Sequence, residues 1–288
     1  MTMVKTRNSS SRRNSTLTTK KVLLSLAGFF VALIFLIPYL RILVTSITAK
    51  RGLYAIPGEY FPSDVAFSNF ITVWDSAPIA RYIFNTLVIS FSATLVVLVV
   101  AVPAAYYMAR FRFRFRGPLL LLVLTTQMFA PTAMVIGIYR QFVTLELVNT
   151  FLALILVNAA FNLAFSTWIM LGFFSGIPVE IEEAAMVDGA SRFQVLRRVT
   201  LPLALPGLLT AVIFTFIASW NEFVVALTLT NTQAVRPLTV GLTEYVGLYE
   251  VQWHYVSMVS LIAIVPVVVL FIMIEKWLVS GLTTGAIK

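Results

Sequence analysis

Five polar side chains lie within or at the ends of long apolar stretches of this sequence, and the chemistry open to them is hydrogen bonding. Asn158 and Asn162 are four residues apart, so on a helix they share one face. Polar groups are costly in lipid and usually face a bundle interior or a water-filled path, where they could bind the hydroxyl groups of a sugar. Hydrogen bonding between helices is their commoner use, and both uses remain open. The five candidates for a solute path are Gln127, Asn158, Asn162, Asn221 and Glu222.

No pattern of residues predicts catalysis or metal binding. The chain has no cysteine and a single histidine, His254, which excludes disulfides, thiolate metal sites and a histidine-based metalloprotease. It also lacks the G-x-x-x-x-G-K-[ST] loop that cradles nucleotide phosphates. We therefore expect no catalytic residue, no metal site and no cofactor in this chain.

The segment 177–202 departs from the apolar pattern and predicts two short helices joined by a tight turn. A proline and several carboxylates at its start suit the first turn of a helix, and Gly189 can adopt the backbone conformation that ends this helix. Ser191 and Gln194 have the spacing of a capping box for the second helix, which Pro202 is expected to terminate. Small residues and mixed charge predict that this segment docks against another protein.

The composition of the whole chain indicates a membrane protein. Hydrophobic residues make up 59% of it and charged residues only 11%, against about 25% charged residues in an average soluble domain. Six runs without charge are each long enough to cross roughly 30 Å of hydrocarbon as a helix, and none alternates as a barrel strand would. We therefore predict an all-α membrane protein with six transmembrane helices and the segment 177–202 as a cytoplasmic loop between spans four and five. The predicted spans cover about residues 21–47, 82–109, 117–139, 149–174, 203–228 and 255–277 of a transmembrane domain over residues 20–288.

The distribution of basic residues predicts the orientation. Fifteen Lys and Arg fall on the side of the N-terminal tail and five on the opposite side, which places both termini in the cytoplasm. Residues 1–19 are rich in Ser, Thr and basic residues and predict a disordered cytoplasmic tail. In the run 110–116 arginine alternates with phenylalanine, which suits phenylalanine at the headgroup boundary and arginine near lipid phosphates. Nucleic-acid binding is not expected.

Two external segments, 50–81 and 231–254, are rich in aromatic and turn-forming residues. Such residues gather where a protein lies along the membrane surface. A contact surface for a partner protein is the alternative interpretation, and the sequence leaves both open.

The loop between spans four and five resembles the EAA signature of importer-type ABC permeases, E-A-A-x3-G-x9-I-x-L-P. The stretches 220–223, 237–242 and 281–286 also resemble the carbohydrate-importer branch of that family, particularly the maltose-type second permease, and the resemblance covers about residues 20–288. Valine stands where the signature usually has isoleucine. The matching residues are Glu183, Ala184, Ala185, Gly189, Val199, Leu201 and Pro202, with Asp188 directly before the glycine.

The resemblance implies a complex in the inner (plasma) membrane of a prokaryotic cell. Its other members would be a homologous second permease that completes a heterodimer, two ATP-binding subunits and an extracytoplasmic solute-binding protein. ATP and Mg²⁺ would be bound by the partner subunits. The loop would act as a coupling helix in a cleft of an ATPase subunit, with Glu183 and Asp188 as charged contacts and Gly189 as the turn.

These observations together predict a permease subunit that moves a di- or oligosaccharide into the cytoplasm by alternating access. Within the same importer class, a phosphorylated polyol or another polar nutrient is an alternative cargo. An ion-coupled secondary transporter is an alternative from a different class.

Overall fold

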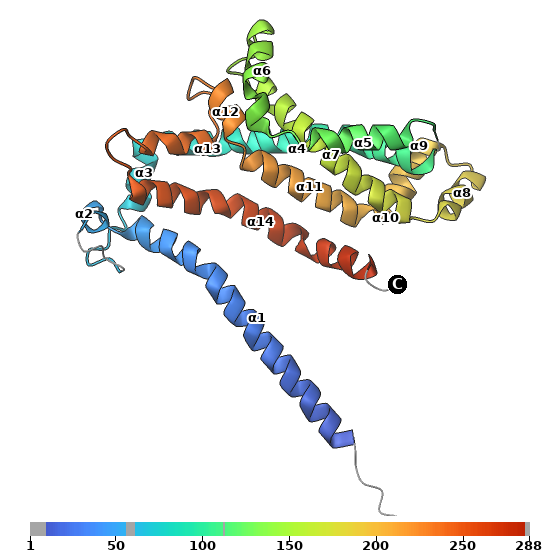
Figure 1. The fold of residues 1–288 in the computed structure, drawn as a ribbon, viewed down its shortest axis with the longest axis horizontal. Coiled ribbons are helices and arrows are strands. Elements are labelled where there is room, and N and C mark those ends of the chain that lie inside the picture. The colour runs from blue at the N-terminus through green and yellow to red at the C-terminus, as the bar shows by residue number, and fades with distance from the viewer. Residues whose placement is uncertain (1–9, 56–60, 112, 286–288) are drawn as a thin grey trace, which may run out of the picture.

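The computed structural model describes residues 10–55, 61–111 and 113–285, and its regular elements are helices. Over these residues it has no strand, only two isolated antiparallel bridges, Thr48 with Val65 and Val246 with Val251. Long helices pack along one another, and the short elements collect toward the two ends of this bundle (Figure 1).

Shorter elements connect the long helices, and most of them lie at one or the other end of the bundle. The long helices are α1 (Ser10–Ile47), α4 (Ile79–Arg110), α7 (Phe151–Gly176), α11 (Leu205–Trp220) and α14 (Trp253–Gly285), with α5 (Arg116–Thr126) and α6 (Pro131–Thr144) between α4 and α7. One end, called here the α8 end, holds α8 (Val179–Val187), α9 (Arg192–Val195), the π-helical turn η1 (Leu196–Thr200) and α10 (Leu201–Leu203). The opposite end, called the α13 end, holds α2 (Lys50–Leu53), α3 (Asn69–Ser76), α12 (Val224–Leu229), α13 (Leu238–Gly241) and the 3-10 turn η2 (Leu242–Tyr245).

Within the described residues, four helices are long and apolar enough to cross a membrane. They cover Lys21–Ile47, Ile79–Arg110, Phe151–Gly176 and Trp253–Lys276. A fifth crossing results if the segment Arg192–Leu203 and α11, which meet at an angle of 79°, are taken as one bent span.

The third predicted span, 117–139, is two helices rather than one. The chain leaves the helical conformation after α5, and Ala130 is extended before Pro131 begins α6. Proline lacks the amide hydrogen that a continuous helix needs, and it disfavours a helical conformation in the residue before it. Gln127 lies in this break and donates its side-chain amide to the carbonyl of Phe161, at 2.8 Å.

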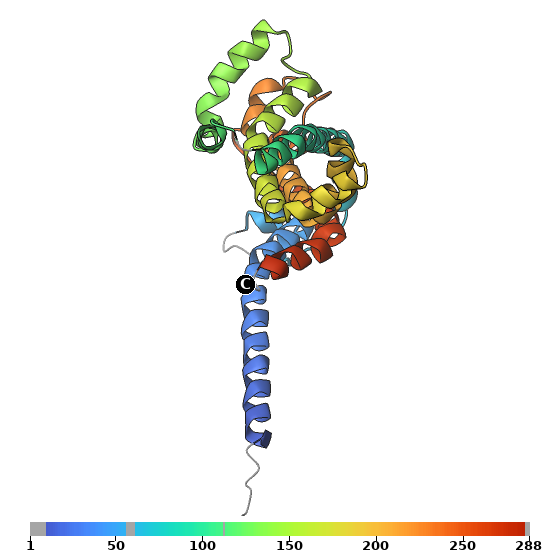
Figure 2. The ribbon, with the colours of Figure 1, turned by 90° about the vertical axis from the view of Figure 1, so that its right-hand side faces the viewer.

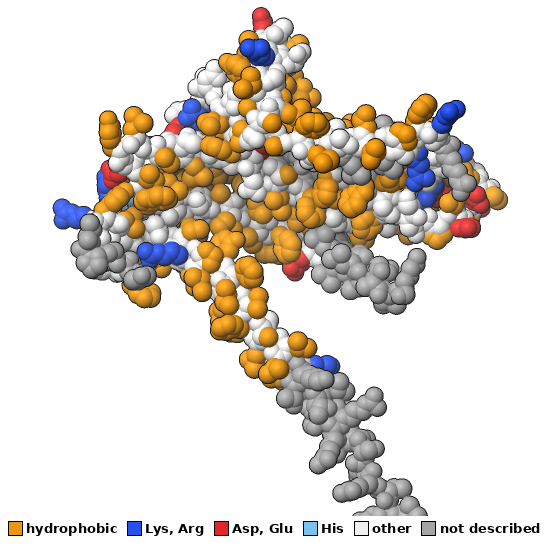
Figure 3. Space-filling view, in the orientation of Figure 1, with side chains coloured by type: hydrophobic (Ala, Val, Ile, Leu, Met, Phe, Trp, Pro, Cys, Tyr) orange, Lys and Arg blue, Asp and Glu red, His pale blue; other side chains and the backbone are white. Residues whose placement is uncertain are grey.

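Helix α1 begins earlier than the sequence predicted; one end of it packs against α14 and the rest leads away from the bundle. Residues 10–19, expected in a disordered tail, continue the helix of the first span, since each residue added to an existing helix gains a backbone hydrogen bond. Residues 1–9 lie outside the described residues. No residue of its most apolar window is buried, and both views show α1 leading away from the other helices (Figures 1 and 2). Its surface is almost continuously hydrophobic (Figure 3).

The core of the bundle is the contact between α4, α7 and α11. Ser166 of α7 and Thr215 of α11 are buried and share a hydrogen bond of 2.8 Å. Gly207 of α11 lies so close to α7 that an added Cβ would be 2.3 Å from the ring of Phe173. Small residues that allow close approach, together with polar pairs, are the usual means by which helices associate in membranes.

We predict that Gly207→Val destabilises the protein, because the new side chain must displace Phe173 and overpacking costs typically about 1–3 kcal/mol. Gly172→Val is the matched control, since an added Cβ at this position of α7 meets no atom within 4 Å. Thermal unfolding of the two purified variants in detergent measures the difference. Equal melting temperatures for both variants would show that the close contact between α7 and α11 contributes nothing.

Candidate functional site

The loop between α7 and α11 folds as the sequence predicted in its first half. Helix α8 follows Pro178, and its first turn carries Glu180 and Glu182, where negative charge is favoured by the helix dipole. Gly189 has a φ of +86°, a conformation that side chains other than glycine rarely adopt. Its amide donates to the carbonyl of Met186 at 3.0 Å, which closes the end of the helix. The prediction that glycine ends this helix is confirmed.

The second half of the loop begins with the predicted capping box and then bends. The Ser191 hydroxyl accepts a hydrogen bond from the Gln194 amide, and the Gln194 side chain accepts one from the Ser191 amide. The helix then widens into η1 and passes through Pro202, which lies inside α10 instead of terminating the helix. The bend of 79° comes at Ala204, after the proline.

A buried carboxylate, Glu182, joins the loop to the spanning helices. Its side chain is 4% exposed and pairs with Arg110, the last residue of α4, at 2.7 Å. The same carboxylate accepts hydrogen bonds from the hydroxyls of Tyr106 (2.9 Å) and Thr200 (2.8 Å). One side chain of α8 is thereby bound to α4 and to η1.

Arg110 extends this connection to the end of α7. Its guanidinium donates to the carbonyl of Phe174 at 2.9 Å and to that of Ile177 at 3.2 Å, as well as to Glu182. The last carbonyls of a helix lack partners within the helix, so a cation at this position satisfies them. The Arg110–Glu182 pair therefore links the ends of α4 and α7 to the start of α8.

The environment of Glu182 keeps its carboxylate ionised. Burial alone would raise its pKa, but hydrogen bonds from Arg110, Thr200 and Tyr106, together with the positive charge of Arg110, outweigh burial and hold the pKa below the ordinary value of 4.5. The stabilisation due to the charged form is therefore complete above that ordinary value and is lost as the pH falls through the lower value in the folded state.

The opposite face of α8 is exposed. Glu183, Ala184, Asp188 and Gly189 are all exposed, and the side chain of Val187 is 87% exposed. Of the other predicted loop residues, Ala185 and Leu201 are half-buried and Pro202 is exposed. We call Glu183, Ala184, Val187, Asp188 and Gly189 the outer face of α8.

Sequence reasoning did not single out Glu182, the residue that fixes the orientation of α8. A signal for it was present, because Glu182 is three and four residues from Ala185 and Met186 and so shares their face of the helix. Both of these residues are half-buried in the structure. Its partner Arg110 lies 72 positions earlier, and no local spacing predicts such a pairing.

The five residues predicted for a solute path all bond to backbone groups of this chain. Gln127 and Asn221 are exposed, Asn162 and Glu222 are half-buried, and Asn158 is buried. The carboxylate of Glu222 accepts from the amides of Val225 (2.8 Å) and Ala226 (2.9 Å) at the start of α12. Three side-chain amides donate to the backbone carbonyl one helical turn earlier: Asn158 to Leu154, Asn162 to Asn158 and Asn221 to Ile217. The fourth, Gln127, donates to the carbonyl of Phe161 in α7.

Two of these five residues line one small pocket. Asn158 and Glu222 line a space of about 10 Å³ together with Ser219, whose buried hydroxyl has no hydrogen-bond partner among the described residues. That volume is about the size that holds one water molecule. The other three candidates, Gln127, Asn162 and Asn221, do not line it.

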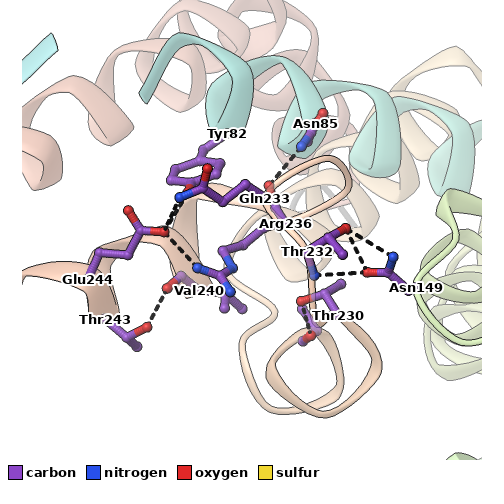
Figure 4. Close-up of polar contacts among 11 residues, drawn as sticks. Tyr82, Asn85, Asn149, Thr230, Thr232, Gln233, Arg236, Val240, Thr243 and Glu244 are labelled. Carbon is purple, nitrogen blue, oxygen red and sulfur yellow. Dashed lines mark hydrogen bonds and ion pairs between the residues drawn. The ribbon is translucent and has the colours of Figure 1, made fainter. Parts of the chain in front are cut away.

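A polar network holds the segment from α12 to η2 against the beginning of α4 (Figure 4). Glu244 accepts hydrogen bonds from Tyr82 of α4 at 2.5 Å and from Arg236 at 2.6 Å. Asn85, one turn further along α4, donates to the carbonyls of Ala234 and Arg236, at 3.1 and 2.8 Å. This loop is therefore fixed to the beginning of the same helix whose other end holds Glu182.

A hairpin follows this network and projects two apolar side chains. Val246 and Val251 form its bridge, and Leu248 and Tyr249 at its tip are 97% and 100% exposed. An ion pair of 2.8 Å between Lys50 and Glu250 ties the hairpin to α2. The segment 231–254, which the sequence predicted to be external, thus contains a hairpin whose two tip side chains are exposed.

Comparisons with known proteins agree with this architecture. The family model described as the inner membrane component of binding-protein-dependent transport systems matches residues 101–284. The permease protein of a sulfoquinovosyl glycerol transport system from Agrobacterium fabrum is 32% identical, over 88% of this chain and 89% of its own. The permease protein of a trehalose/maltose transport system from Thermococcus litoralis is also 32% identical, over 93% and 97%. The crystal structure of a bacterial ABC transporter that imports alginate contains a similar chain, with a TM-score of 0.73, 25% identity and coverage of 94% and 99%.

We predict that Glu182→Gln lowers stability strongly, because Arg110 then remains buried without a counter-charge and breaking a buried pair costs about 3–5 kcal/mol. Glu180→Gln, an exposed change on the same helix, should cost at most about 1 kcal/mol, the usual contribution of one charge near a helix N-terminus. Thermal unfolding near neutral pH and near pH 4 measures both effects. Acid should destabilise the parent protein more than the Glu182→Gln variant, and an equal effect of acid on both would contradict the assignment.

Proposed function

Since the chain belongs to the family of inner-membrane components of binding-protein-dependent transport systems, we propose that it is a membrane-spanning permease subunit of an ATP-driven importer of saccharides. The chain has no nucleotide-binding loop of its own, so ATP binding and hydrolysis fall to partner subunits. One relative belongs to a sulfoquinovosyl glycerol transport system and the other to a trehalose/maltose transport system. The ABC transporter with the similar chain is involved in alginate import. A saccharide is therefore the proposed cargo.

The observation that carries this proposal is the division of α8 into a buried and an exposed face. The buried face is anchored through Glu182, while the outer face presents small residues, two carboxylates and an exposed valine. Small side chains permit close approach by another surface, and the carboxylates can pair with its basic groups. We propose that the outer face of α8 docks into an ATPase subunit, with Glu183 and Asp188 as charged contacts.

The Arg110–Glu182 pair supplies the route by which docking reaches the solute path. When an ATPase subunit moves the outer face of α8, Glu182 transmits the displacement to the ends of α4 and α7, and Thr200 transmits it to η1 and so to α11. The result is alternating access, in which the spanning helices rock between two arrangements that the partners at either end favour differently.

The proposed topology keeps six crossings. Helices α5 and α6 together form the third, with a break at residues 127–130, and residues 203–228, which contain α11, form the fifth. The distribution of the basic residues supports a cytoplasmic position for the α8 end and both termini, with the α13 end outside. The permease domain spans residues 20–288, and its helix α1 offers an apolar surface to lipid and to a homologous second permease.

At the outer end, the proposed partner is the solute-binding protein. The hairpin tip with Leu248 and Tyr249 is fully exposed, and its base is held by the ion pair between Lys50 and Glu250. An ordered loop with an apolar tip presents contact area at little cost in conformational entropy. A related alginate importer has been crystallised in complex with its periplasmic protein.

We propose that the solute path runs past the polar side chains of the spans. Gln127 and Asn221 are the exposed members, and each lies where a helix breaks or ends, at the α5–α6 break and after α11. Asn158, Asn162 and Glu222 lie deeper and support that region through their own hydrogen bonds.

The experiment that tests this function is a mild-detergent pull-down of the tagged chain from its native membranes, with ATP hydrolysis measured on the captured complex. We expect a second multi-span protein and an ATPase to co-purify with the parent chain. Gly189→Val should lose most of the ATPase, since a β-branched residue is strained at a φ of +86°.

Gly189→Asn is the matched control, because asparagine tolerates the left-handed conformation better and should retain more of the ATPase. A chain that is captured alone and transports in proteoliposomes without ATP would contradict the proposal.

A further inference from the structure

Two consecutive residues at the end of α4 contact the two halves of the loop between α7 and α11. Arg110, the last residue of α4, pairs with Glu182 of α8 at 2.7 Å. The next residue, Phe111, lies under Arg192, the first residue of α9, whose guanidinium carbon is 5.0 Å from the centre of the ring. An arginine within about 6 Å of an aromatic ring is attracted by the negative charge on the face of the ring. The end of α4 therefore contacts both the helix before the Gly189 turn and the helix after it.

The ring of Phe111 is itself joined to the bundle. Helix α4 ends at this residue, which is extended, and its amide donates to the carbonyl of Tyr107 at 2.9 Å. The rings of Phe111 and Tyr107 are stacked, with their centres 4.5 Å apart and their planes inclined by 19°. Tyr107 also contacts the ring of Phe113, which packs against buried residues of α4, α7 and α11. Arg192 thus rests on a ring that the surrounding side chains hold in place.

The turn between the two contacts has little support of its own. Asp188 and Gly189 are exposed, and the capping box of Ser191 and Gln194 lies within the start of α9. The angle between α8 and α9 therefore depends on where each helix is attached. The Glu182 carboxylate attaches α8, and the contact between Arg192 and Phe111 attaches the start of α9.

We propose that Phe111 and Arg192 are positioning residues for the ATPase subunit, because their contact holds α9 at the angle to α8 in which the loop docks. A loop that is already held in its bound arrangement loses less conformational entropy on binding, so the contact increases affinity without touching the partner. The inference rests on the proposed docking of the outer face of α8 and adds the residues that shape the docked loop.

The test measures the affinity of ATPase subunits, purified from the parent complex, for the permease pair in nanodiscs. Arg192→Gln and Phe111→Leu should each weaken binding about two- to fivefold, the factor that corresponds to about 0.5–1 kcal/mol for a cation–π contact at an exposed site. The double variant should bind no more weakly than either single variant, since both changes remove the same contact. Phe111→Tyr keeps the aromatic ring and should bind as the parent does.

Phe115→Leu is the matched control, because Phe115 belongs to the same run of alternating residues and its side chain is 68% exposed. It should bind as the parent does, and co-purification of the second permease verifies that each variant is assembled. The inference is overturned if Phe111→Leu binds as tightly as the parent, or if the losses of the two single variants add in the double variant. Both of these outcomes leave the proposed function intact, since the parent then still binds the ATPase. A parent that binds no ATPase would overturn the proposed function and this inference together.

Discussion

The buried ion pair between Arg110 and Glu182 is the constraint on which the rest of this structure depends. A carboxylate that is almost fully buried is unfavourable unless its charge and its oxygens are matched, and here an arginine and two hydroxyls match them. Those partners belong to α4 and to η1, and the arginine also holds the end of α7. These contacts hold α8 in its orientation on the bundle, and that orientation decides which of its residues face outward.

Contacts within the bundle connect the anchored helix α8 to the other helices. Helices α4, α7 and α11 are packed closely through Gly207 and through the Ser166–Thr215 hydrogen bond, and α4 is bound at its other end to the loop that contains Glu244. These contacts join α8 to the α13 end through a single packed unit. Helix α1 lies outside this unit and buries none of its spanning window.

Local patterns predicted the features that depend on neighbouring residues. The apolar runs located the long helices, the positive φ of Gly189 and the Ser191–Gln194 box followed from spacing, and the family that the loop resembles is confirmed by the match over residues 101–284. Features set by distant residues were not predictable in this way. The pairing of Glu182 with Arg110 and the fixed outer hairpin depend on residues 72 and 200 positions apart. The break before Pro131 was overlooked because hydropathy does not register a lost backbone donor.

The central claim is that the pair transmits movement and does more than stabilise the fold. The direct measurement is the number of saccharide molecules imported per ATP hydrolysed, in proteoliposomes of the assembled importer, for the double variant Arg110→Met with Glu182→Leu. Replacing both charges by apolar side chains removes the link without leaving a lone buried charge, so the complex should assemble. The account predicts ATP hydrolysis with import per ATP reduced at least about tenfold, whereas import per ATP at the parent level would contradict it.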